Sequence, residues 1–107
     1  MPRAYHVYVI ALNPRVLQRK AFRRRNPGHR PGLPCVYVGS SVRPPDERFD
    51  QHKHDYRANR FAREYGEHLM PEVFEQYNPI PSRAEAEELE EYLAERLRAK
   101  GWAVWQG

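Results

Sequence analysis

The chain has 107 residues, a formal net charge of +4 at pH 7 and 40% hydrophobic residues. This length predicts a single domain over residues 1–107, with one core and room for one site. The lone cysteine, Cys35, excludes an internal disulfide and a cysteine-based zinc cluster, and it fits a reducing compartment.

The sequence contains no apolar run of the roughly 18 residues that a membrane-spanning helix needs, and no apolar segment of signal-peptide type follows Arg3. We therefore expect a cytoplasmic protein that does not associate with membranes.

Positive charge is concentrated in the first part of the chain. Residues 1–60 contain 13 Lys and Arg against 4 Asp and Glu, a balance of +9, whereas residues 61–107 contain 5 against 10, a balance of −5. Such clustering is typical of a face that binds a polyanion. Arginine, whose planar fork suits phosphate, outnumbers lysine 15 to 3. A GC-rich genome would also favour arginine, but it would not explain the clustering.

The first predicted element is a strand in "AYHVYVIAL", residues 4–12, which is rich in β-branched and aromatic residues. Alternation places Tyr8 on the face of the strand opposite to Val7 and Val9. Residues 13–34 form a basic insertion without an acidic residue, and its four prolines interrupt any long element. A short helix is expected around residues 15–22 and a loop over the rest.

The second predicted strand is "CVYVG", residues 35–39, in which Val36 and Val38 share one face and Cys35 and Tyr37 the other. Tyr37 and Tyr8 would share a face of the sheet if the two strands pair.

A helical pattern follows over residues 46–65, anchored by Phe49, Tyr56, Phe61 and Tyr65. Arg48 and His52 lie four residues apart and are therefore neighbours on one side of this helix. A third strand is predicted in "EVFEQY", residues 72–77, closed by a turn over residues 78–81.

The last predicted element is a helix over residues 83–100. Ser82 and Glu85 have the spacing of a capping box, and Gly101 stands where a helix ends. Ala86, Leu89, Leu93 and Leu97 form the apolar stripe, and Glu90 also falls on it. A buried carboxylate is costly unless it has a cation or hydrogen-bond donors, so Glu90 is expected to have a partner.

These motifs resemble the GIY-YIG nuclease superfamily, in the order "HVY" (6–8), "YVG" (37–39), "RFDQH" (48–52) and "AEELE" (86–90). The resemblance implies an α+β fold, a small central antiparallel β-sheet of about three strands flanked by helices. It also implies a metal-dependent endonuclease that hydrolyses phosphodiester bonds in DNA, with RNA left open.

The resemblance assigns roles to the motif residues. Glu90 would bind Mg²⁺, or Mn²⁺ in its place, and Arg48 would bind the scissile phosphate, with His52 beside it. Tyr8 and Tyr37 would flank the attacking water, one as general base and the other orienting, with a slight preference for Tyr37 as the base. An unperturbed tyrosine is a weak base at pH 7, so its pKa would have to be lowered by a cation such as Arg48 or His52.

Nucleic-acid binding is assigned to Gly39 and Ser40, which follow the second tyrosine, and to the basic insertion. Gly39 would let the backbone pass close under the phosphate. In the insertion, the residues expected to contact the nucleic-acid backbone are Arg19, Lys20, Arg23, Arg24 and Arg25.

The sequence departs from the family pattern at several positions. His6 replaces the first glycine, the basic insertion lengthens the gap between the tyrosines, and Ser40 stands where some members have lysine. The asparagine that many members carry near the C-terminus has no match, and Gln106 is the nearest candidate.

Two alternatives stay open: a catalytically impaired nucleic-acid-binding module on the same fold, and a protein-interaction domain that docks through the acidic last helix. A recognition-domain partner or a homodimer is also compatible with the sequence.

Overall fold

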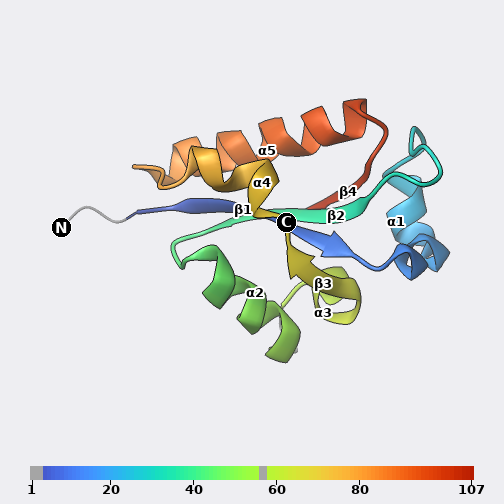
Figure 1. The fold of residues 1–107 in the computed structure, drawn as a ribbon, viewed down its shortest axis with the longest axis horizontal. Coiled ribbons are helices and arrows are strands. Elements are labelled where there is room, and N and C mark those ends of the chain that lie inside the picture. Colours follow the sequence, from blue (N-terminus) through green and yellow to red (C-terminus); the bar gives the residue numbers. More distant parts are fainter. Residues whose placement is uncertain (1–3, 56–57) are drawn as a thin grey trace.

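The computed structural model describes residues 4–55 and 58–107 (Figure 1). Its strands are β1 (His6–Leu12), β2 (Cys35–Ser41), β3 (Gly66–Leu69) and β4 (Ala103–Gln106). Its helices are α1 (Lys20–Arg24), α2 (Pro45–His54), α3 (Arg60–Tyr65), α4 (Pro71–Phe74) and α5 (Arg83–Ala99), with 3-10 turns η1 (Pro14–Gln18) and η2 (Glu75–Tyr77).

The strands form one sheet in the order β3-β1-β2-β4. β1 is antiparallel to both β2 and β3, whereas β4 is parallel to β2. Helices α4 and α5 lie on one side of the sheet, and α2 and α3 lie on the other (Figure 1). The predicted α+β class is confirmed. The sheet is mixed and has four strands in the described residues, instead of about three antiparallel ones.

The register of β1 against β2 explains why the two tyrosines meet. Tyr8 lies opposite Gly39 and Ile10 lies opposite Tyr37, so all four share the face that α2 covers. The ring centroids of Tyr8 and Tyr37 are 6.1 Å apart. The prediction that the tyrosines share a face is therefore confirmed. Valines from β1 and β2 occupy the other face, beneath α5.

Helix α5 matches its sequence signals. The Ser82 hydroxyl accepts a hydrogen bond from the Glu85 amide at 3.2 Å, and Gly101 follows the helix with a φ of +96°. Glu90 is buried with the apolar stripe, as predicted. None of the helices in residues 4–55 and 58–107 is long and apolar enough to cross a membrane.

Two predicted elements are wrong. The segment predicted as a strand over residues 72–77 is helical in α4 and η2, because Pro71 takes the first position of a helix, where its missing N–H costs nothing. The third strand is instead Gly66–Leu69, just after the segment predicted as a long helix.

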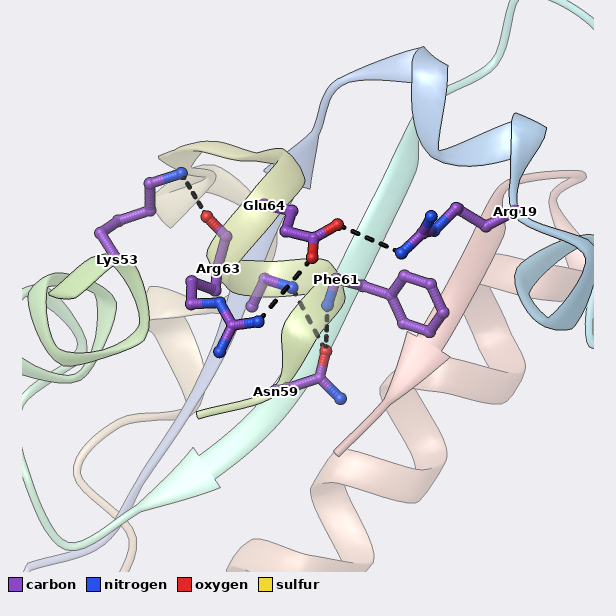
Figure 2. Close-up of polar contacts among 7 residues, drawn as sticks. Arg19, Lys53, Asn59, Phe61, Arg63 and Glu64 are labelled. Atoms are coloured by element: carbon purple, nitrogen blue, oxygen red, sulfur yellow. Dashed lines mark hydrogen bonds and ion pairs between the residues drawn. The ribbon is translucent and has the colours of Figure 1, made fainter. Parts of the chain in front are cut away.

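That long helix is two shorter ones, α2 and α3. Asn59 starts α3, because its side-chain oxygen accepts hydrogen bonds from the amides of Phe61 (2.9 Å) and Ala62 (3.2 Å) (Figure 2). Tyr56, one of the predicted anchors, lies outside the described residues.

Strand β4 was not predicted. It is only four residues long, and it begins two residues after Gly101. Its outer edge is completed by Asn26, whose side chain pairs with both backbone groups of Val104, accepting from the amide at 2.7 Å and donating to the carbonyl at 3.1 Å. The basic segment thus folds against the sheet and contains η1 and α1 where one short helix was expected.

Candidate active site

A cavity opens where β2 extends beyond its neighbour. Strand β4 ends at Gln106, opposite Val38, while β2 continues to Ser41. Successive side chains of a strand point to opposite faces, so Gly39 faces α2 and Ser40 faces α5. Groups from both sides of the sheet therefore meet at this edge.

The cavity has a volume of about 490 Å³. Six of the residues that line it were assigned to the site from the sequence: Tyr8, Tyr37, Gly39, Ser40, Arg48 and Glu90. They come from β1, β2, α2 and α5. The fold brings together side chains that are up to 82 positions apart in the chain.

His52, on α2, lies directly behind Tyr8. A hydrogen bond of 2.9 Å joins the Tyr8 hydroxyl to His52 Nε2, and His52 is fully buried. Burial, together with the neighbouring Arg48 charge, lowers the pKa of His52 from 6.5 to about 4. The imidazole is therefore neutral at pH 7, and its other nitrogen, Nδ1, has no hydrogen-bond partner within the described residues.

The electrostatic environment of the tyrosines differs from the expectation. Burial raises the pKa of both Tyr8 and Tyr37, and the opposing effect of Arg48 is smaller. His52 is neutral and adds no positive charge. The expectation that Arg48 or His52 lowers a tyrosine pKa below its ordinary value is wrong, so neither hydroxyl is a phenolate at pH 7.

Gly39 owes its place to packing against Tyr8. A Cβ at this position would lie 2.5 Å from the Tyr8 hydroxyl oxygen and 3.0 Å from a ring carbon of Tyr37. Any side chain would displace the Tyr8 ring. The structure thus supplies a packing reason for glycine, where the sequence suggested close passage of the backbone under a phosphate.

Glu90 has only 6% of its surface exposed. Its Oε2 accepts a hydrogen bond of 2.7 Å from the Ser40 hydroxyl, while Oε1 is buried without a partner in the described residues. Burial raises the pKa of Glu90; the Ser40 hydrogen bond opposes this effect and the nearby Glu87 adds to it. The expected partner exists, but it is a neutral hydroxyl.

Arg48 lies on the first half of α2, where its Nη1 donates to Gln51 Oε1 at 3.2 Å. Five further residues that the sequence did not assign to the site also line the cavity: Arg83, Glu87, Glu91, Gln106 and Gly107. Arg83 could have been found from helical spacing, because it lies seven residues before Glu90 on the same face of α5. Gln106, noted only as the nearest candidate for the family's asparagine, shares the α5-facing side of the sheet with Ser40.

The five basic residues assigned to nucleic-acid binding do not line this cavity. Arg19 contacts Glu64 at 3.3 Å, and Glu64 also contacts Arg63 (Figure 2). Arg23 donates to the Leu17 carbonyl, and the Arg25 guanidinium lies over the Trp105 ring at 4.7 Å.

The remaining two basic residues, Lys20 and Arg24, have no side-chain hydrogen bond or ion pair in the part of the chain that the structure describes. The basic segment therefore combines cations that hold the fold with cations that are free to bind an anion.

The GIY-YIG catalytic domain model matches residues 32–102, more than half of the chain. No curated protein and no solved structure matches the chain significantly. The matched range contains Tyr37, Arg48 and Glu90 but not Tyr8, which the fold places beside them. On this match the chain belongs to the GIY-YIG catalytic domain family, whose members are nucleases that act on nucleic acids.

Proposed function

We propose that this chain is a divalent-metal-dependent endonuclease that hydrolyses phosphodiester bonds in DNA. The carrying observation is that two tyrosines, an arginine and a buried glutamate, from four separate elements, line one cavity. Phosphodiester hydrolysis needs an activated water, donors for the charge on the phosphate, and help for the leaving oxygen. These residue types supply such groups.

Arg48 is the proposed contact to the scissile phosphate. Its guanidinium fork can donate two parallel hydrogen bonds to phosphate oxygens. Gln51 accepts from one of its nitrogens at 3.2 Å. That bond would hold the guanidinium toward the cavity and leave its other donors for the phosphate.

Tyr8 is the proposed acceptor of the proton from the attacking water. A buried, protonated tyrosine cannot act as a free phenolate, so it needs a group that takes its own proton as it accepts another. Neutral His52 is the neighbouring acceptor, since Nε2 lies 2.9 Å from the Tyr8 hydroxyl. Its pKa of about 4 makes it a weak base, so the negative charge of a phosphate bound in the cavity would have to stabilise its protonated form. Tyr8 would pass its proton to His52 while it takes one from water, and Tyr37 would orient that water. The geometry favours Tyr8 over Tyr37 as the base.

Glu90 is the proposed ligand for Mg²⁺ or Mn²⁺. The residues fit such an ion, because Glu90 Oε1 is a buried carboxylate oxygen without a partner in the described residues, and carboxylate oxygen suits hard divalent cations. No group of three or more potential ligands occurs in the same residues, so water and phosphate would complete the coordination. When bound, the ion would neutralise charge on the phosphate.

The test is to incubate the protein with supercoiled plasmid, with and without Mg²⁺ or Mn²⁺, alongside Glu90→Ala. Nicking should require the metal and disappear in the variant, whose thermal unfolding should confirm that the fold is retained. A structured RNA of similar length tests the choice of DNA. Undiminished nicking by Glu90→Ala, or nicking in excess chelator, would overturn the proposal.

A further inference from the structure

The Ser40 hydroxyl is already paired with another side chain of the site. A serine hydroxyl has one proton to donate, and Ser40 donates it to Glu90 Oε2 at 2.7 Å. The lone pairs that remain on its oxygen would repel a phosphate oxygen. The geometry thus argues against the nucleic-acid contact expected from the sequence and toward a role in holding the carboxylate.

Stability does not explain the pairing of Ser40 with Glu90. The carboxylate is 6% exposed, it has one hydrogen bond and its other oxygen has no partner in the described residues. A half-satisfied buried carboxylate destabilises a fold relative to an apolar residue of similar size. The pairing is instead suited to fixing the plane of the carboxylate, whose terminal torsion is otherwise broad.

Building on the proposed function, we infer that Ser40 is a positioning residue that orients Glu90 and leaves Oε1 as the oxygen that binds the metal. Ser40 stands on β2, which pairs with β1 through its whole length, so the donor is fixed to the sheet while its acceptor is on α5. Partners of metal ligands that act in this way typically contribute tenfold or more to metal affinity.

The test measures Mn²⁺ binding by the DNA-free protein, through paramagnetic broadening of backbone amide signals near Glu90. Ser40→Ala should raise the Mn²⁺ concentration needed for half-broadening by roughly tenfold. Ser40→Thr, which keeps the hydroxyl on a β-branched residue suited to a strand, should restore wild-type affinity. Ser41→Ala is the matched control, since Ser41 is the next residue on β2 and its side chain points to the opposite face.

Equal Mn²⁺ affinity in Ser40→Ala and wild type would overturn the role of Ser40 while Glu90 could still be the ligand. An unrestored Ser40→Thr would also count against it, because the hydroxyl is the argued group. If Glu90→Ala binds Mn²⁺ at these amides as wild type does, the proposed metal site itself fails. These results separate a failure of the inference from a failure of the proposed function.

Discussion

The described residues contain three buried polar side chains, Asn26, His52 and Glu90. Asn26 lies at one end of the sheet, and His52 and Glu90 lie at the other. Asn26 donates to the carbonyls of Phe22 and Val104, and it accepts from the Val104 amide and from Arg98. His52 and Glu90 each have one hydrogen bond, and each retains one buried atom without a partner in the described chain.

This difference distinguishes a polar side chain that is buried for stability from polar side chains that are buried for function. A fully paired amide completes a sheet edge and adds stability, because each of its polar atoms replaces the water it lost. A half-paired imidazole or carboxylate costs stability, so another benefit must account for it. Both half-paired groups contact residues that line the cavity, Tyr8 and Ser40, and both have a role in the proposed chemistry. His52 would act through the Nε2 that is bonded to Tyr8, and Glu90 would act through its unpaired Oε1.

The largest expected effect is on the nicking rate, and it tests the end of the sheet that holds His52 and Glu90. Tyr8→Phe removes the hydroxyl that His52 serves, and we expect the single-turnover rate of plasmid nicking to fall by about 10²-fold or more. Tyr37→Phe should cost less, because Tyr37 has the orienting role. The rates are measured at saturating enzyme, so that weaker DNA binding does not contribute.

The control for this pair is thermal unfolding, which should show a folded protein in both variants. A larger loss in Tyr37→Phe than in Tyr8→Phe would reverse the assignment of the base. Wild-type rates in both variants would eliminate a tyrosine base.

The next effect tests the fully paired end. Asn26→Ala leaves the buried Val104 amide without its partner, and we expect the free energy of unfolding to fall by about 2 kcal/mol. Nicking by the folded protein should be unchanged.

Glu90→Gln should show the opposite result. It should lose nicking but keep its stability, because the substitution removes a poorly paired buried charge. Denaturant unfolding compares the two, and an equal loss of stability in both would erase the distinction.

Sequence signals located the elements with strong local determinants. β1, β2 and α5 follow from alternation or from caps, and the motif residues Tyr8, Tyr37, Arg48 and Glu90 do line one cavity. β4 was missed because its four residues carry too little pattern, and its position depends on Asn26, 78 residues earlier. The partners of Glu90 and Tyr8 were not predicted, since hydrogen bonds between distant residues depend on register and packing that no local pattern encodes.

His52 gives an effect of similar size that depends on pH. Its pKa is lowered to about 4 in the folded protein, so between pH 6.5 and 4 the unfolded chain binds a proton that the folded chain does not. Its contribution to stability is complete above pH 6.5 and is lost as the pH falls toward 4. Relative to His52→Gln, the unfolding free energy of wild type should therefore fall by about 1 kcal/mol per pH unit in this window.

Denaturant unfolding of both proteins at several pH values measures this difference, which cancels the titration of groups common to both. Parallel stability profiles would show that His52 is not held neutral by burial.

The smallest expected effect is on the salt dependence of DNA binding. It compares the cations of the basic segment that hold the fold with those that are free to bind an anion. Lys20→Ala with Arg24→Ala removes two charges that have no hydrogen bond or ion pair in the described residues. If both contact the DNA backbone, the slope of log affinity against log salt should become shallower by about two units, one for each contact, on every sequence alike. The unfolding free energy and the nicking rate at saturating enzyme should not change, because neither residue lines the cavity.

The charge-conserving pair Lys20→Arg with Arg24→Lys is the matched control and should keep the wild-type slope. The broader variant with Arg23, Arg24 and Arg25 replaced by alanine is less clean, because it also removes the Arg23 bond to Leu17 and the stacking of Arg25 on Trp105. A loss of stability in that variant, together with an unchanged salt slope in the Lys20 and Arg24 pair, would make the basic segment structural throughout and place the DNA contacts elsewhere.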